Sequence, residues 1–98
     1  MAFMRVHNQP PKILIIEDDP DVLNAMNIAL ASLGFDVEVL LGGKSILENK
    51  FTVPDLFILE KRLLDVDGLE VCRYLKSKQH YKDLPIIMIS SSPKFRKK

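Results

Sequence analysis

Four short apolar runs divide the chain into segments that resemble strands. They cover residues 12–16, 35–39, 56–59 and 86–89. Apolar runs of this length between turn residues are typical of strands buried on both faces of a parallel sheet. In the second run, apolar residues alternate with Asp36 and Glu38, which predicts a half-buried strand near a sheet edge.

Three helices are predicted between these runs. Asp19 suits an N-cap before Pro20, apolar residues then recur at helical spacing, and Gly34 is a natural helix stop. Residues 44–50 predict a short helix, and residues 68–79 predict a longer one with Leu69, Cys72 and Leu75 on its buried face. Around them we expect a flexible leader over 1–11, one domain over 12–92 and a basic tail over 93–98.

The regular alternation of strands and helices predicts the fold class. Short links between the elements favour an α/β fold, a doubly wound parallel sheet with right-handed crossovers and helices on both faces. With 98 residues the chain forms one small domain.

Composition excludes several classes of function. A net charge of +1 gives no strong attraction to nucleic acid or membranes, and a single cysteine excludes an intrachain disulfide. The N-terminus carries no long apolar stretch, so neither a signal peptide nor a membrane span is predicted, and a cytoplasmic location is expected. Gly43-Lys44-Ser45 resembles the end of a P-loop, but position 38 is glutamate where that motif requires glycine.

Polar side chains follow three of the predicted strands. Glu17 and Asp18 come after the first strand, Glu60 ends the third, and Ser90 follows the fourth. The carboxyl ends of parallel strands meet at one edge of a sheet, where open α/β folds keep their sites. Clustered carboxylates repel one another unless a cation joins them, and oxygen ligands suit Mg²⁺ or Ca²⁺. Taken alone, Glu60 is better explained as the first solvated residue after a core strand.

Three segments, ILIIEDDP, PDLFILEKRLLDVDGLEVCRYLK and PIIMIS, resemble the receiver domain of two-component response regulators. The resemblance covers about residues 12–90, with the motifs in the right order. It implies the flavodoxin-like receiver fold with strand order 2-1-3-4, strand 5 being absent from this chain. It also implies a signalling role in a phosphorelay rather than an enzyme activity.

The resemblance also implies the roles of individual residues. Glu17 and Asp18 match an acidic pair that binds Mg²⁺, and Glu60 matches the aspartate that accepts phosphate from a histidine kinase. Arg62 matches the residue whose backbone carbonyl binds the metal. Ser90 matches the hydroxyl residue that contacts the phosphoryl group. The expected metal ligands are therefore Glu17, Asp18, Glu60 and Arg62.

Glu60 departs from the family pattern, which has aspartate at this position. One extra methylene moves the carboxylate by roughly an ångström, and such a misplacement can reduce a rate by about 10²-fold. We therefore expect the acceptor position to be degenerate or phosphomimetic. As a mimic it is weak, because it carries about −1 charge against about −1.5 to −2 for a protein phosphate.

The family's helix 4, strand 5 and helix 5 are not matched in this chain, which leaves the strand at 86–89 as a predicted sheet edge. Native proteins cover such apolar edges, so we expect either a fragment of a longer polypeptide or a homodimer through this strand. Two alternatives to the signalling module remain open. One is a non-phosphorylated structural or dimerisation module, and the other is a small Mg²⁺-dependent phosphatase.

Overall fold

Four parallel strands form the centre of the protein. The computed structural model describes residues 9–90, and its strands are β1 (Lys12–Ile16), β2 (Asp36–Leu40), β3 (Leu56–Glu60) and β4 (Ile86–Ile89). Their order in the sheet is β2-β1-β3-β4. Ile13 of β1 lies opposite Val37 of β2 and Leu56 of β3. The predicted strand order and parallel direction are confirmed.

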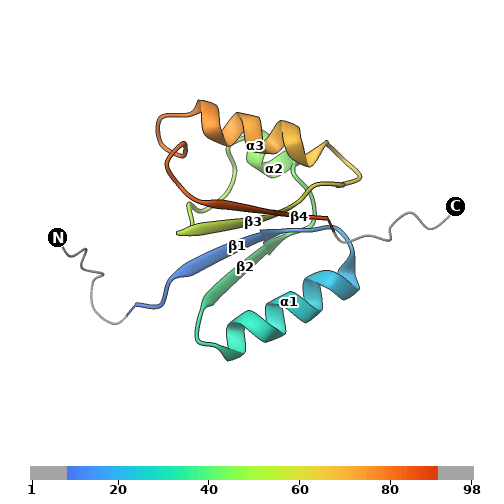
Figure 1. The fold of residues 1–98 in the computed structure, drawn as a ribbon, viewed down its shortest axis with the longest axis vertical. Helices are drawn as coiled ribbons and strands as arrows, with labels where there is room; N and C mark the ends of the chain where they lie inside the picture. The colour runs from blue at the N-terminus through green and yellow to red at the C-terminus, as the bar shows by residue number, and fades with distance from the viewer. Residues whose placement is uncertain (1–8, 91–98) are drawn as a thin grey trace, which may run out of the picture.

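Helices cover both faces of this sheet (Figure 1). α1 (Pro20–Ser32) lies on one face, while α2 (Lys44–Leu47) and α3 (Gly68–Ser77) lie together on the other. Each helix connects two parallel strands, as parallel pairing requires a crossover. The predicted doubly wound α/β fold is therefore confirmed.

The ends of α1 follow from local sequence. The Asp19 carboxylate accepts hydrogen bonds from the backbone N–H groups of Asp21 and Val22, at 3.0 and 3.4 Å. Asp19 is thus the predicted N-cap, and Pro20 occupies the first turn, where its missing N–H costs nothing. Beyond the helix, Gly34 has φ of +97°, a left-handed conformation that favours glycine and ends the helix.

The buried face of α3 differs from the sequence prediction. Val71 and Leu75 are fully buried, whereas Leu69 is 38% exposed and Cys72 is only partly buried. Gly68 explains why α3 turns a different face to the sheet from the one that the sequence predicts. A Cβ at Gly68 would lie 2.3 Å from the backbone oxygen of Glu60, so only glycine lets the helix start rest on the end of β3. Positions 68, 71 and 75 then share the face that contacts the sheet.

Two apolar cores fill the layers. The core between the sheet and α2 and α3 contains the larger set, namely Leu14, Ile16, Ile46, Phe57, Leu59, Leu63, Val71, Leu75 and Tyr81. The core beneath α1 is smaller and consists of Ile13, Ile15, Leu23 and Ile58. Full burial of one such side chain contributes about 1.5–3 kcal/mol to folding. The sheet therefore depends most on the layer that α3 covers.

β4 is less buried than its apolar sequence predicts. Ile87 is 49% exposed, and β4 pairs only with β3 within residues 9–90. The prediction of a fully buried fourth strand is wrong, because no described segment covers its second edge. The prediction that this strand is a sheet edge is consistent with the described part of the chain.

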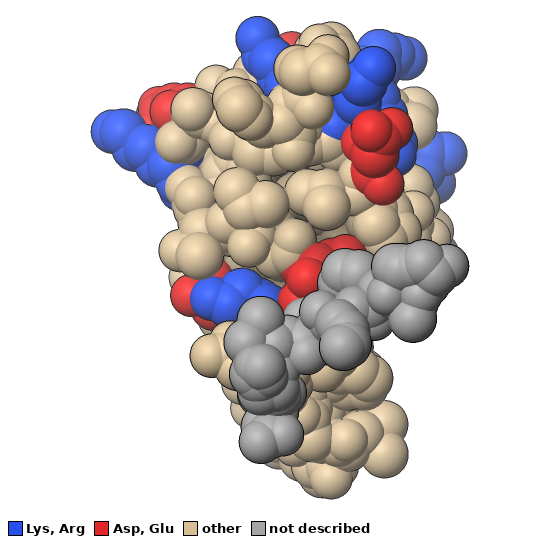
Figure 2. Space-filling model, turned by 90° about the vertical axis from the view of Figure 1, so that its left-hand side faces the viewer, with Lys and Arg blue, Asp and Glu red and all other residues tan. Residues whose placement is uncertain are grey.

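Charge is unevenly distributed over the surface. α1 has Asp21 as its one charged residue, and the end of the molecule near this helix shows no charged side chain in Figure 2. None of the described helices is long and apolar enough to cross a membrane. Most of the predicted leader, the last two residues of the predicted domain and the whole predicted basic tail lie outside the described residues.

Candidate functional site

Two glutamates lie at the carboxyl ends of the two central strands. Ile16 of β1 is paired with Leu59 of β3, so Glu17 and Glu60 occupy the next position on neighbouring strands. Both are fully buried. Alternation along a strand puts them on the same side of the sheet as Ile15 and Ile58. The predicted gathering of these two carboxylates at one edge is consistent with this register.

The Glu60 carboxylate bends back onto the loop that follows its strand. Its Oε2 accepts a hydrogen bond from the backbone N–H of Arg62 at 2.8 Å. A buried carboxylate is costly without such donors, so this bond contributes to holding the loop. Arg62 therefore contacts Glu60 through its backbone, while the Arg62 residue as a whole is exposed.

The two acids after β1 also bind backbone amides. Oε2 of Glu17 accepts from the N–H of Asp19 at 2.9 Å. Oδ2 of Asp18 reaches across to a different loop and accepts from the N–H of Leu64 at 2.6 Å. Glu17 organises its own turn, whereas Asp18 joins the loop after β1 to the loop after β3.

Ser90 is the first residue beyond β4. Ile89 pairs with Glu60, and the backbone oxygen of Ile89 accepts from Lys61 N–H at 2.8 Å, so the β3–β4 ladder extends to this edge. Ser90 is exposed there. Its predicted contact with a phosphoryl group stays a prediction.

The magnesium ligands expected from the sequence stay a prediction in this structure. Within residues 9–90, no group of three or more His, Cys, Asp or Glu side chains is placed to hold a metal ion. Oxygen donors suit Mg²⁺, but one oxygen of each expected carboxylate, in Glu17, Asp18 and Glu60, binds a backbone N–H. The chemistry of the donors fits the ion, and the ligand set itself stays a prediction.

Asp65 is a site residue that the sequence analysis missed. Its two oxygens accept from the N–H groups of Gly43 and Lys44 at 3.1 and 2.9 Å, which links the loop before α2 to the loop before α3. A Cβ at Gly42 would lie 2.5 Å from the Asp65 carboxylate, so a glycine there permits the approach. The Gly42-Gly43 pair in the sequence was the available signal.

Hydrogen bonds also set the ionisation of Asp65. Burial raises the pKa of this carboxyl, but bonds from the backbone N–H groups of Gly43, Lys44 and Val66 outweigh it and leave the pKa below its usual 3.8. Asp65 thus remains a carboxylate under mild acid, which keeps the two loops joined.

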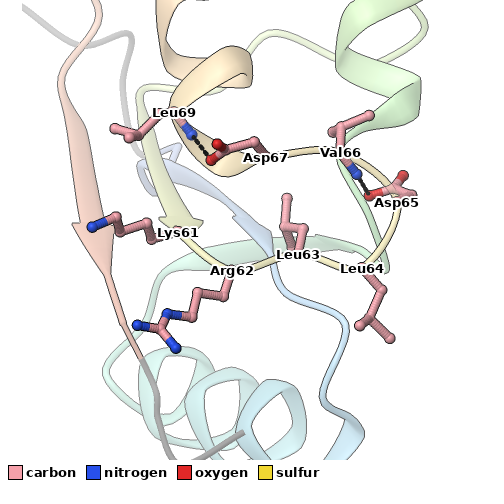
Figure 3. Close-up of a pocket in the computed structure, with 8 residues that line it drawn as sticks. All are labelled: Lys61, Arg62, Leu63, Leu64, Asp65, Val66, Asp67 and Leu69. Carbon is pink, nitrogen blue, oxygen red and sulfur yellow. Dashed lines mark hydrogen bonds between the residues drawn. The ribbon is translucent and has the colours of Figure 1, made fainter. Parts of the chain in front are cut away.

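The loop between β3 and α3 borders a hollow of about 480 Å³ (Figure 3). Lys61 and Arg62 extend on one side of the loop, while Leu64 points away from the other residues drawn. The Asp67 carboxylate accepts from Leu69 N–H at 3.0 Å and caps α3, as the predicted turn requires. The loop therefore presents cations on one side and an exposed leucine, 90% accessible, on the other.

A model of the response regulator receiver domain matches residues 13–97. Over 84 residues the chain is 36% identical to the DNA-binding dual master transcriptional regulator RpaA of Synechocystis sp.. The match covers 83% of this chain. The same match covers 34% of the length of RpaA. The similarity therefore concerns about a third of RpaA.

Solved structures share the fold. The N-terminal domain of a response regulator receiver protein from Methanoculleus marisnigri JR1 superposes with a TM-score of 0.76 at 27% identity, over 85% of this chain and 68% of that one. A second solved structure is the receiver domain of sensor histidine kinase PA1611 from Pseudomonas aeruginosa, which is described with magnesium coordinated in its active-site cleft. It superposes with a TM-score of 0.76 at 24% identity, over 85% of this chain and 69% of that one. The second likeness concerns the fold alone.

Proposed function

This chain belongs to the family of response regulator receiver domains, which are signalling rather than catalytic, and we propose that it is a receiver module with a degenerate acceptor position. In this proposal it takes part in a two-component phosphorelay in the cytoplasm and regulates a partner through its surface. In this proposal Glu60, which stands at the acceptor position, imitates the charge of a phosphorylated acceptor.

One observation carries the proposal. The Glu60 carboxylate is fully buried and its Oε2 binds the backbone N–H of Arg62 at 2.8 Å. A phosphoryl donor needs an accessible carboxylate oxygen in line with the transferred group. A buried glutamate that stabilises its own loop is poorly placed for that reaction, and well placed to hold the loop in one conformation.

Acetyl phosphate tests the degenerate acceptor. The protein is incubated with acetyl phosphate and Mg²⁺, and its intact mass is measured over time. We expect no added phosphoryl mass in the wild-type chain. A stable adduct that maps to Glu60 by peptide analysis, and is missing in Glu60→Gln, would overturn the proposal and make the protein a working receiver.

Magnesium binding is a separate part of the proposal. Glu17, Asp18, Glu60 and the carbonyl of Arg62 are its candidate ligands, and Asp18 now binds Leu64 N–H. Titration with Mg²⁺ followed by calorimetry measures the affinity directly. Heat of binding that is lost in Asp18→Asn supports these ligands, and no heat at millimolar Mg²⁺ removes the metal from the proposal.

Within residues 9–90 one edge of β4 is unpaired, which favours a second candidate function, a dimerisation module. Ile87 is 49% exposed on a strand with one partner among the described residues. Unpaired strand edges bind other strands through their free backbone groups. We therefore propose a homodimer through β4, alongside a histidine kinase or other signalling protein as partner. Light scattering at high micromolar concentration tests it, and a monomer with a cooperative melt contradicts it.

A further inference from the structure

An acidic groove runs beside the first turn of α1. It consists of two hollows that share Pro20 and Asp21. The first, of about 320 Å³, is lined by Asp18, Asp19, Pro20, Asp21 and Leu64. The second, of about 450 Å³, is lined by Pro20, Asp21, Leu23, Asn24, Asn27 and Val39. The two hollows adjoin at Pro20 and Asp21, and their linings together reach from Leu64 in the loop after β3 to Val39 of the outer strand β2.

Apolar side chains are exposed at both ends of this groove. Leu64 is 90% exposed at one end and Val39 is 38% exposed at the other. Figure 3 shows the Leu64 side chain directed away from its own loop. Large apolar side chains left in water favour contact with a partner when they border a hollow.

Hydrogen bonds hold the Leu64 backbone in place. Its N–H donates to Asp18 at 2.6 Å, and the next residue, Asp65, binds the N–H groups of Gly43 and Lys44. A loop tied to two neighbouring loops loses little freedom when a partner binds. Pre-organisation of this kind reduces the entropic cost of association.

The charge of the groove limits the kind of partner. Asp18, Asp19 and Asp21 line it, and among residues 9–90 no lysine or arginine lines either hollow. Such a surface repels the phosphates of nucleic acids and of anionic membranes. It attracts a segment in which lysine or arginine side chains stand beside apolar ones.

We propose that this groove binds a basic amphipathic segment of a partner protein. Apolar side chains of the segment contact Leu64 and Val39, and its cations face the carboxylates of Asp19 and Asp21. Recognition of this kind combines apolar anchors with charge complementarity. The inference rests on the proposed function in one respect, namely that the module acts through a partner, and it adds the chemistry of that partner.

The test uses a fluorescein-labelled amphipathic peptide of leucine and lysine, with a leucine and glutamate peptide of the same pattern as its counterpart. Binding to the full chain is followed by fluorescence polarisation at low and at high salt. We expect the lysine peptide to bind, with weaker binding at high salt, and the glutamate peptide not to bind. Leu64→Ser and Asp21→Asn should each weaken binding about tenfold.

Two control variants distinguish binding in the groove from nonspecific binding of the peptide to the protein surface. Val53→Ser removes an exposed apolar side chain from the loop before β3, and Asp36→Asn removes an exposed carboxylate at the start of β2. Both should leave the affinity unchanged. Equal losses in the groove and control variants would overturn the proposal, as would equal binding of both peptides.

A further measurement identifies a different occupant. If the lysine peptide does not bind, and Leu64→Ser lowers the mass measured by light scattering, the groove contacts a second copy of the chain and the proposal is wrong. None of these measurements involves phosphorylation of Glu60. The groove can therefore fail while the degenerate acceptor stands, and the reverse is equally detectable.

Discussion

The Asp18 carboxylate accepts a hydrogen bond from the backbone N–H of Leu64 at 2.6 Å, although the two residues belong to loops after different strands. β1 and β3 are neighbours in the sheet, so a short side chain spans the distance between these loops. The acid that resembles a metal ligand in the sequence therefore has a structural role in the folded chain.

Asp18→Ala should release the loop after β3. The N–H of Leu64 loses its carboxylate acceptor, and we expect the free energy of unfolding to fall by about 1 kcal/mol. The loss is modest because water can replace the acceptor at this exposed bond. Urea denaturation measures this change, and hydrogen exchange at the Leu64 amide should become faster. Asp18→Asn keeps an oxygen acceptor and should show a smaller effect. Equal exchange rates in wild type and Asp18→Ala would contradict the role assigned to this bond.

Asp65 should make stability depend on acid pH. Its folded-state pKa lies below the usual 3.8, so its contribution is complete above that value and is lost as the pH falls through the folded pKa. Urea midpoints of wild type and Asp65→Asn, measured from neutral pH downwards, should differ most at neutral pH. The two curves should converge below the folded pKa. A constant difference across the acid range would show that ionisation of Asp65 does not stabilise the fold.

Gly68→Ala should disturb the junction between β3 and α3. The added Cβ would lie 2.3 Å from the backbone oxygen of Glu60 and 2.8 Å from Cα of Lys61, so backbone atoms must move. We expect a loss of about 1–3 kcal/mol in the free energy of unfolding. Gly34→Asn is the control, because nothing lies within 4 Å of a Cβ there and asparagine tolerates positive φ. Thermal melts that rank the two variants in the opposite order would contradict this reading.

Two leucines of α3 provide a matched test of its buried face. Leu75 is fully buried and Leu69 is 38% exposed. Leu75→Ala should lower the free energy of unfolding by about 2–5 kcal/mol, which a domain of this size barely tolerates. Leu69→Ala should lower it by well under half as much. Circular dichroism during urea unfolding measures both. Similar losses would mean that the helix packs on the face the sequence pattern suggested.

Ile87→Lys tests the proposed homodimer through β4 and should weaken it. A charge on an exposed edge strand opposes pairing with another strand, and the side chain is already 49% exposed, so the monomer should remain folded. Sedimentation or light scattering should show a shift toward monomer. Leu33→Lys, at the exposed end of α1, is the control and should leave the mass unchanged.

The strands were predictable because their signal is local, and their order was implied by the resemblance to receiver domains. Apolar runs such as 12–16 end abruptly in acids, and alternation with helices allows few topologies. The buried face of α3 was not predictable from spacing, because Leu69 and Val71 both fit a helical pattern that includes Leu75. The close approach of Gly68 to Glu60 decides between them, and this contact exists only after folding.

The candidate site was also predictable only in part: the position of the strand ends was predictable, and the hydrogen bonds between the loops were not. The meeting of Glu17 and Glu60 follows from parallel strands, since residues that end neighbouring strands share an edge. The bonds of Asp18 to Leu64 and of Asp65 to Gly43 and Lys44 join residues far apart in sequence. Only the shape of the loops determines such bonds.

The central position of β1 also affects how the chain assembles during synthesis. β1 is the first of the described strands to be synthesised, yet it pairs with β2 and β3, and β3 begins only at Leu56. Until β3 emerges, the apolar side chains of Ile13 to Ile16 lack one of their neighbours. Such non-local pairing slows folding and exposes nascent strands to other chains. A ribosome that pauses before β3 would therefore prolong the period in which β1 lacks this neighbour.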